Sequence, residues 1–349
     1  MGSKKYQALM YATLAAVFYA VNIPVSKLLL GEVGPTTMAS LLYLGAGIGV
    51  GLLALINRKE AAQAPSLSKQ DLPYVIGMIA LDIAAPILLM LGISYGTSAN
   101  ASLLGNFEIV ATAIIALLIF KEAVSKRLWG AIALISLSSL LLSFEGADSF
   151  KFSLGSIFVL LATTCWGLEN NCTRSIASKS TYQIVVLKGI FSGLGALVIT
   201  LIKGEGMPAL GYAAVAMLLG FVAYGLSIFM YVRAQNVLGA AKTSACYAVA
   251  PFVGAFLAFV FLHESLSWMY LVALMIMVAG SGLVVIDTLR LSHVHSHEHT
   301  FVHTHDGTTH AHTVSHSHRH NHYFNEDKHS HHHDVTELEK LPGARLYNA

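Results

Sequence analysis

The chain of 349 residues is 55% hydrophobic and only 11% charged, and its formal net charge is +2. Soluble domains carry about 25% charged residues, so residues 1–290 cannot cover themselves with an ordinary water-facing surface. This composition excludes a soluble globular protein, and the small net charge gives no support to a nucleic-acid partner.

Ten apolar runs follow one another along the chain, separated by short loops that contain Gly, Pro or Ser. A helix that crosses about 30 Å of hydrocarbon needs roughly 20 such residues. The first run follows Lys4 and Lys5 but extends to Leu30, so we interpret it as an uncleaved helix in the lipid bilayer. We therefore predict an all-α membrane protein with ten transmembrane helices, at residues 8–30, 36–56, 73–95, 99–120, 127–145, 154–173, 182–202, 210–232, 240–262 and 268–288.

The distribution of Lys and Arg over the loops predicts the orientation of these helices. The N-terminus and the loops after every second helix hold twelve Lys and Arg residues, whereas the opposite loops hold only Lys151 and Lys203. Cytoplasmic loops of membrane proteins carry the excess of positive charge. We expect a multi-pass protein of the cell membrane whose N- and C-termini are both cytoplasmic.

The two halves of the chain repeat one another. Phe18–Asn22 matches Cys165–Glu169 at an offset of 147, and Phe120–Glu122 matches Leu262–Glu264 at an offset of 142. Because five helices are an odd number, the two copies must have opposite orientations in the membrane. Inverted repeats are typical of transporters whose site lies near the bilayer midplane. We predict a first five-helix repeat at 1–145, a second at 146–290, and a His-rich tail at 291–349.

The same motifs carry a family resemblance. The segments Tyr19–Lys27 and Trp166–Arg174, together with Ala250–Phe252 leading to Leu262–Glu264, resemble the EamA-type branch of the drug/metabolite transporter superfamily. The resemblance covers about residues 8–288 and implies a central cavity and alternating access for a small solute of undefined kind. One position departs from the pattern, because the first half has Ile109, preceded by Glu108, where the second half has Pro251.

Three acidic residues, Asp82, Glu108 and Glu169, are candidates for positions within the membrane rather than at the last residues of a predicted span. A charged side chain at mid-membrane costs roughly 2.5 to 3.5 kcal/mol, so it needs a reason to be there. Burial favours the uncharged form, which suits a carboxyl group that loads and releases a proton, and the same groups could ligate a cation. The alternative is structural pairing with Lys27, Arg174 or Lys188, or contact with water at helix ends.

Neutral polar and aromatic residues complete a candidate transport pathway. Lys188 belongs to it as a partner of an acid, as a group that reaches towards water, or as a contact for an anionic substrate. Any single aromatic residue is more often part of the core than a ligand contact. The expected substrate cavity consists of Tyr19, Asn22, Asn106, Trp166, Asn170, Tyr224, Tyr247 and Pro251, with Tyr231 nearby.

Four glycines of the second predicted helix, Gly45, Gly47, Gly49 and Gly51, allow close contact with another helix. Their spacing fits two interpretations, packing within the bundle or the face of a homodimer.

Sixteen of the seventeen histidines lie in the tail, many in His-x-His runs. Neighbouring imidazoles bind borderline metals such as zinc, nickel, cobalt or copper. The segment has few apolar residues, so we expect it to be disordered without metal. The candidate metal ligands are His293, His295, His297, His299, His303, His305, His310, His312, His316, His318, His320, His322, His329, His331, His332 and His333.

The favoured function is gradient-driven transport of a small solute or metabolite, with proton coupling and a metal-binding tail. The alternatives are a carrier for zinc, nickel or cobalt that the tail loads, and a membrane-anchored metal sensor or buffer. We expect no enzyme, because His-Glu-x-x-His and P-loop patterns do not occur in the sequence. No cofactor is expected beyond a transition metal on the tail.

Overall fold

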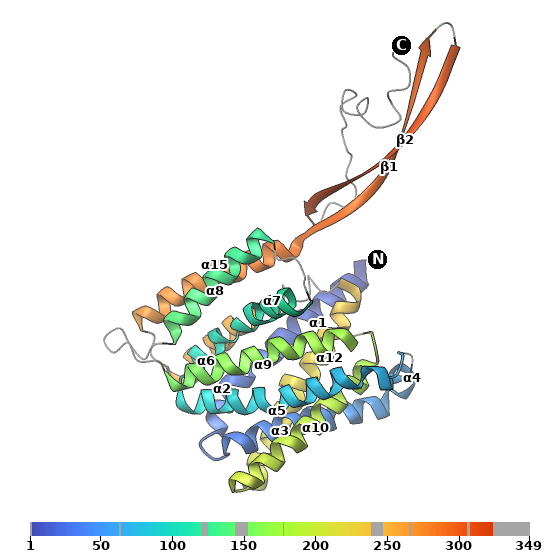
Figure 1. The fold of residues 1–349 in the computed structure, drawn as a ribbon. Helices are drawn as coiled ribbons and strands as arrows, with labels where there is room; N and C mark the ends of the chain where they lie inside the picture. Colours follow the sequence, from blue (N-terminus) through green and yellow to red (C-terminus); the bar gives the residue numbers. More distant parts are fainter. Residues whose placement is uncertain are drawn as a thin grey trace. The chain divides into compact units, whose positions relative to one another are not determined.

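The computed structural model describes residues 2–62, 64–120, 125–143, 153–176, 178–238, 247–264, 267–305 and 308–323. The chain divides into two compact units, residues 1–287 and 288–349 (Figure 1). The described part of the first unit is helical, and that of the second contains the end of the last helix and two strands.

The described helices are α1 (Gly2–Ala20), α2 (Asn22–Leu29), α3 (Pro35–Ile56), α4 (Arg58–Ala61), the 3-10 helix η1 (Lys69–Asp71), α5 (Leu72–Tyr95), α6 (Ser98–Leu104), α7 (Phe107–Phe120), α8 (Lys126–Leu142), α9 (Leu154–Ile176), α10 (Thr181–Lys203), α11 (Leu210–Gly220), the π-helix η2 (Phe221–Leu226), α12 (Ser227–Leu238), α14 (Ala250–Leu262) and α15 (Trp268–Leu289).

Every predicted span contains helix, and seven helical stretches are long and apolar enough to cross a membrane by length and composition. Three of the ten fall short. The described helices α8 and α14 have 17 and 13 residues. Helix α9 is long enough, but Glu169, Asn170 and Asn171 make its second half polar. The count of ten therefore remains a prediction. The seven stretches are Tyr6–Leu29, Pro35–Ile56, Lys69–Tyr95, Ser98–Ile119, Thr181–Lys203, Leu210–Ala234 and Trp268–Asp287.

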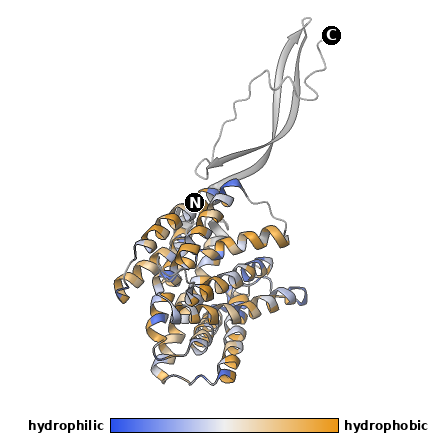
Figure 2. Ribbon diagram, turned by 60° about the vertical axis from the view of Figure 1, so that its left-hand side comes forward, coloured by the Kyte–Doolittle hydropathy of each residue, from blue (hydrophilic) through white to orange (hydrophobic). Residues whose placement is uncertain are grey.

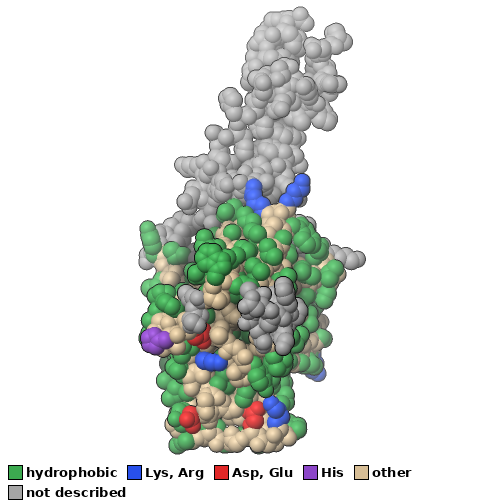
Figure 3. Space-filling model, turned by 90° about the vertical axis from the view of Figure 1, so that its left-hand side faces the viewer, with side chains coloured by type: hydrophobic (Ala, Val, Ile, Leu, Met, Phe, Trp, Pro, Cys, Tyr) green, Lys and Arg blue, Asp and Glu red, His purple; other side chains and the backbone are tan. Residues whose placement is uncertain are grey.

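Hydrophobic residues make up much of the helices of the first unit (Figure 2), and many of their large side chains are exposed. Ile202, Leu210 and Trp268 are among the most exposed, and Leu210 keeps 86% of its surface accessible. In Figure 3 one face of this unit shows mainly hydrophobic side chains and only scattered charges. Apolar surface on this scale needs a non-aqueous environment, as a lipid bilayer provides.

The helices of the two halves pack on one another in a reciprocal pattern. Helix α5 packs on α9 and α7 also contacts α9, while α12 packs on α1 and α14 also contacts α1. Helix α3 packs on α10 (Figure 1). If each span is exchanged with the span five places away, the contacts of α5 and α7 with α9 become the contacts of α12 and α14 with α1. The contact between α3 and α10 is unchanged by this exchange. A two-fold relation between the halves requires this reciprocity.

Glycines on α3 allow this close packing. A Cβ atom at Gly45 would lie 2.0 Å from the backbone oxygen of Met217 in α11, and one at Gly47 would lie 2.6 Å from the backbone nitrogen of Ile190 in α10. These side-chain-free positions therefore serve packing within the bundle, which is the first of the two interpretations of the glycine spacing.

Three interruptions occur in the middle of long helical stretches. The first separates α1 from α2 at Val21, just before Pro24, which has no N–H to donate. The second separates α6 from α7, where the backbone N–H of Glu108 donates to the oxygen of Gly105 over 3.1 Å in a tighter turn. The third is the π-helical turn η2, which contains Tyr224. Such irregularities are frequent at functional sites.

Two carboxylates that are remote in sequence stabilise helix starts. The backbone N–H groups of Thr36 and Thr37, at the start of α3, each donate to Oε2 of Glu205 over 3.0 Å. The N–H groups of Ser98 and Ala99, at the start of α6, donate to Glu264 over 2.7 and 2.8 Å. A negative charge at this end of a helix is favourable because the N–H groups there are otherwise unpaired.

The expected disorder of the His-rich tail is wrong for residues 290–323. These residues form two antiparallel strands, β1 (Arg290–His305) and β2 (Thr308–Tyr323), paired from Arg290 opposite Tyr323 to His305 opposite Thr308. The tract alternates His with Ser, Thr and Val, and this period of two fits an extended strand. The predicted ligands His329, His331, His332 and His333 lie outside the described residues.

Candidate functional site

A buried ammonium group lies between two buried carboxylates in the helical unit. Nζ of Lys188 in α10 is 3.1 Å from Oδ2 of Asp82 in α5 and 3.0 Å from Oε1 of Glu169 in α9. All three side chains are buried, Asp82 completely. The ion pairs offset part of the cost of removing these charges from water. Since one ammonium serves two carboxylates, this triad carries a net charge of −1 when all three groups are ionised.

Two hydroxyl groups complete the surroundings of the triad. Tyr43 in α3 donates from its hydroxyl to Oδ1 of Asp82 over 2.9 Å, and the hydroxyl of Thr173 donates to Oε1 of Glu169. Sequence reasoning missed both residues. Tyr43 lies in the middle of the second predicted span, and Thr173 lies one helical turn after Glu169. These positions could have identified both residues as candidates for the site.

Glu108 has a different environment from the other two acids. It lies in the first turn of α7, is only half-buried, and accepts a hydrogen bond over 2.6 Å from Nδ2 of Asn170 in α9. Nδ2 of Asn170 is also 3.4 Å from the Thr112 hydroxyl. Among the described residues, no Lys, Arg or His lies within 4.0 Å of the Glu108 carboxylate. The described contact partner of Glu108 is therefore a neutral amide, and the nearest ammonium that acts on its charge, that of Lys188, is paired with the other two acids.

The close approach of α7 and α9 depends on Gly167. A Cβ atom at this position would lie 2.8 Å from the backbone nitrogen of Thr112 and 2.6 Å from Cβ of Ala111. Without a side chain at Gly167 the two helices come near enough for Asn170, three residues further along α9, to reach Glu108. The local sequence thus determines the geometry of the Glu108 site.

Tyrosine rings gather beside these acids. The ring centroid of Tyr19 in α1 is 6.0 Å from that of Tyr224 in η2 and 5.5 Å from that of Tyr247, just before α14. Tyr43 extends the group, because its ring is 5.1 Å from that of Tyr224. The rings join two of the helical interruptions, the one at Val21 and the π-helical turn η2, and Tyr43 links them to Asp82.

The tyrosine group is also electrostatically connected to Glu108. Tyr19, Tyr224 and Tyr247 lie within electrostatic range of the Glu108 carboxylate. Asn22, at the start of α2, donates from Nδ2 to the Tyr224 hydroxyl over 3.0 Å. A carboxylate beside several aromatic rings attracts cations through both its charge and the ring faces.

The remaining predicted cavity residues border the same region. Asn106 is buried at the turn between α6 and α7, and its Nδ2 has no partner among the described residues. Cγ of Pro251 lies 3.9 Å from where a Cβ of Gly105 would be. Trp166 is part of the main apolar core. This unsatisfied buried amide, two residues before Glu108, is a donor that a solute oxygen could use.

Lys27, whose ammonium group lies near the C-terminal end of α5, has a structural role. Nζ of Lys27 donates to the backbone oxygens of Ile93 and Gly96 over 2.6 and 2.7 Å. A positive group at a helix C-terminus satisfies carbonyls that have no partner within the helix. Lys27 is therefore not the partner of Asp82, Glu108 or Glu169.

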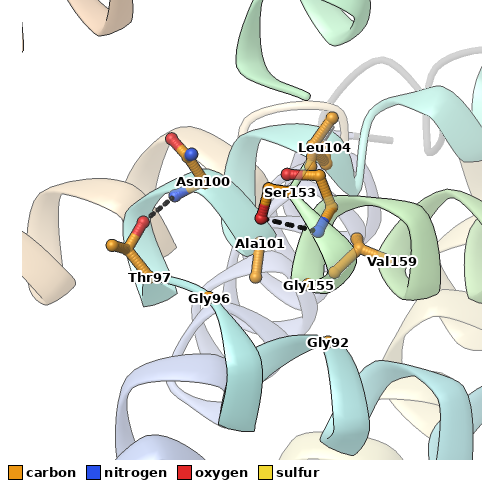
Figure 4. Close-up of a pocket in the computed structure, with 10 residues that line it drawn as sticks. Gly92, Gly96, Thr97, Asn100, Ala101, Leu104, Ser153, Gly155 and Val159 are labelled. Atoms are coloured by element: carbon orange, nitrogen blue, oxygen red, sulfur yellow. Dashed lines mark hydrogen bonds between the residues drawn. The ribbon is translucent and has the colours of Figure 1, made fainter. Parts of the chain in front are cut away.

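A small pocket of about 10 Å³ lies between α5, α6 and α9. Thr97, Asn100 and Ser153 line it together with glycines of the neighbouring helices (Figure 4). Its volume suits about one water molecule, and it contains none of the three acids. We therefore place the candidate site at the acid and tyrosine cluster instead.

The residues with described side chains contain no group of three or more His, Cys, Asp or Glu placed to hold a metal ion. The histidine side chains of the tail are not among them. The predicted metal ligands therefore remain a prediction at the level of side chains.

Comparison with known proteins supports the family resemblance. The model of the EamA-like transporter family matches residues 7–144 and 153–286. An uncharacterised transporter of Methanothermobacter thermautotrophicus is 26% identical over 291 residues, which are 76% of this chain and 82% of the relative. The uncharacterised transporter YyaM of Bacillus subtilis is 23% identical over 263 residues, 70% of this chain and 82% of the relative.

The fold also occurs among solved structures. One crystal structure of a protein without a functional description superposes with a TM-score of 0.59 at 15% identity, over 80% of this chain and 96% of its own. This similarity concerns the fold alone. With the family match over most of the chain, it confirms the resemblance: the chain is a multi-pass membrane protein that belongs to the EamA-like transporter family.

Proposed function

We propose that the protein is a gradient-driven transporter that exchanges protons for a small solute, with Glu108 as the group that carries the proton. The observation behind the proposal is the contrast among the three acids. Asp82 and Glu169 share Lys188, whereas Glu108 has a neutral amide partner and is only half-buried. A carboxylate without a counter-ion in a low-dielectric site readily binds a proton or a cation.

The charge balance favours a solute that carries a positive group. Three carboxylates and one ammonium give the site a negative net charge whenever at least two of the acids are ionised. Tyr19, Tyr224 and Tyr247 add aromatic rings, which attract ammonium groups. The Lys188 ammonium is already engaged by two carboxylates, so it is not free to attract an anionic solute. Competition between a proton and a cationic solute for Glu108 couples the two fluxes.

Alternating access needs two arrangements of the bundle around this site. The reciprocal helix contacts and the two separate family matches support two inverted repeats, 1–145 and 146–290. The interrupted helices α1–α2 and α6–α7 border the acid and tyrosine cluster and offer hinges. We propose ten spans with both termini cytoplasmic, as the loop charges predict.

A metal-cation transporter is the second candidate, because imidazoles are concentrated in the tail. Among the described residues, no His or Cys forms a hydrogen bond or ion pair with the three acids, although Cys172 lies within electrostatic range of Asp82 and Glu169. Oxygen ligands alone suit hard cations better than zinc, nickel or cobalt. The tail is therefore better assigned to metal binding than to the transport path. A metal sensor or buffer would not need the buried triad of Asp82, Glu169 and Lys188. No step of the proposed transport is enzymatic.

Reconstituted vesicles with an imposed pH gradient test this function. The solutes to compare are a quaternary ammonium ion, a primary amine, a neutral amide, a carboxylate and Zn²⁺. We expect gradient-driven flux of the cationic organic solutes in wild type, and its loss in Glu108→Gln. Flux of the carboxylate alone, or equal flux in Glu108→Gln, would contradict the proposal.

A matched control shows whether the variant fails for a structural reason. Asp71 is an acid outside the cluster that accepts hydrogen bonds from Ser68 and pairs with Lys179. Asp71→Asn also removes a carboxylate, but it leaves the transport site intact. We expect this variant to keep gradient-driven flux, and both proteins to elute as single peaks from size-exclusion columns.

A further inference from the structure

Strands β1 and β2 form a long two-stranded hairpin (Figure 1), and their register places every histidine of the two strands on one face of it. Alternate residues of a strand share a face, and directly paired residues of antiparallel strands share it as well. All histidines of β1 have odd numbers, all those of β2 have even numbers, and the register pairs odd with even positions. The face holds His293, His295, His297, His299, His303, His305, His310, His312, His316, His318, His320 and His322.

The opposite face contains no histidine at its described positions. Those positions carry Ser, Thr, Val, Ala, Asn, Glu, Arg and Tyr. A random scatter of twelve histidines over both strands would occupy both faces. The hairpin is therefore two-sided, with all of its imidazole chemistry on one side.

Eight of the twelve histidines form four pairs directly across the two strands. Three pairs follow one another on the same face, and the fourth lies near the turn. Paired Cβ atoms in such a ladder are about 4.5 to 5.5 Å apart, and successive positions on one face are about 6.8 Å apart. The pairs are His293 with His320, His295 with His318, His297 with His316, and His303 with His310.

The other four histidines of this face have no histidine opposite them. His299 pairs with Val314, His305 with Thr308, His312 with Phe301, and His322 with Leu291. This division into paired and unpaired histidines comes from the register and not from composition. It provides a built-in comparison for any test of the ladder.

We propose that residues 290–323 form a metal ladder, in which two adjacent cross-strand histidine pairs hold one divalent transition-metal ion of the zinc class. Zinc takes four ligands in tetrahedral geometry with Zn–N distances of about 2.0 to 2.1 Å, and two pairs supply four imidazoles. The first site uses the pairs of His293 and His295, and the third successive pair extends the ladder. Hard cations such as Mg²⁺ and Ca²⁺ prefer oxygen ligands and are not expected to bind.

Metal binding also explains how so polar a hairpin can persist. An isolated two-stranded hairpin is marginally stable in water, and this one lacks an apolar face. A metal ion that bridges the strands adds its binding free energy to the stability of the paired form. The ladder and the hairpin therefore form together.

Zinc titration of the full-length protein in detergent, in competition with a chromophoric chelator, tests the ladder. One triple variant, His316→Asn with His318→Asn and His320→Asn, removes one member of each successive pair. Its control, His299→Asn with His305→Asn and His312→Asn, removes three unpaired histidines. We expect the first to weaken the tightest zinc site by about 10-fold or more and the control to change it little. Equal losses in both variants, or no zinc binding by wild type, would overturn the proposal.

A variant with unchanged composition gives a second test. Exchanging Val294 with His295 and Ser296 with His297 moves two histidines to the opposite face. Infrared amide I spectra should show a zinc-induced gain in strand signal in wild type and none in this variant, and an equal gain in both would refute the ladder. Zinc binding decides this inference and solute flux decides the proposed function, so the two can fail separately.

Discussion

Nδ2 of Asn170 lies 2.6 Å from Oε1 of Glu108, whereas Nζ of Lys188 lies 3.0 Å from Oε1 of Glu169, the residue next to Asn170 in α9. Adjacent positions of one helix thus form two different environments. Glu169 faces an ammonium group and Glu108 faces a neutral amide. Helix geometry separates neighbouring side chains by about 100°, which allows this division. The two acids of the triad share Lys188 as a counter-ion, whereas among the described residues Glu108 contacts only a neutral amide.

The tyrosine rings should contribute to solute affinity through their faces. We expect Tyr247→Leu to raise the KM for a quaternary ammonium solute by about 2- to 30-fold, which corresponds to about 0.5 to 2 kcal/mol of cation–π attraction. Tyr247→Phe keeps the ring and should stay close to wild type. The measurement is the solute concentration dependence of flux in vesicles. Equal KM values for all three proteins would exclude a role for the ring.

The buried triad should be important for stability because its charges depend on one another. Lys188→Met leaves Asp82 and Glu169 without a counter-ion, and we expect a loss of about 3 to 5 kcal/mol. Asp82→Asn in the same chain removes one of the uncompensated charges and should recover part of the loss. Thermal unfolding in detergent measures both. An unchanged unfolding temperature in Lys188→Met would show that the triad carries no such coupling.

Glu205 should make stability depend on pH in the acid range. Partial burial alone would raise the pKa of its carboxyl group, but hydrogen bonds from Thr36, Thr37 and Lys203 outweigh burial and lower the pKa below its usual value. Because the folded-state pKa is the lower one, this stabilisation is present above the unfolded pKa of about 4.3 and is lost as pH falls through the folded value.

Replacement of this carboxyl group should remove that dependence. Glu205→Gln should lower stability by about 1 kcal/mol at neutral pH, as loss of a helix cap does, and the difference from wild type should shrink towards pH 3. The measurement is the unfolding temperature of both proteins from pH 7 to pH 3. A difference that stays constant over this range would contradict the role of the ionised carboxylate.

Gly45 and Gly47 of α3 should tolerate no side chain. At Gly47 a Cβ atom would approach backbone atoms of α10 to 2.6 Å, so Gly47→Ala should destabilise the bundle by about 1 to 3 kcal/mol. Gly206 has nothing within 4 Å of such an atom, and Gly206→Ala is the matched control. Thermal unfolding in detergent compares the two. Equal stability of both variants would argue against tight packing of α3 on α10.

Sequence reasoning predicted the helices and the family because those features depend on local composition and repeated motifs. It named Asp82, Glu108, Glu169 and Lys188, since each ionisable residue stands out in an apolar run. It could not determine which acid pairs with Lys188, because the pairing depends on how α5, α9 and α10 rotate against one another. It also passed over Tyr43, whose hydroxyl matters only through its contact with Asp82.

For the tail, sequence reasoning gave too much weight to composition and too little to the spacing of residues. Its low apolar content predicted disorder, but the alternation of His with small and β-branched residues also has the period of a strand. The register between β1 and β2, which places His295 opposite His318, is a non-local property. Composition alone does not reveal it.

The central claim is that Glu108 carries the coupled proton, and proton counting tests it most directly. A pH dye inside vesicles records proton movement while a labelled quaternary ammonium solute is followed at the same time. We predict that wild type moves protons against the solute, and that Glu108→Gln moves none although it still exchanges labelled for unlabelled solute. Proton movement in Glu108→Gln equal to that of wild type would contradict the account.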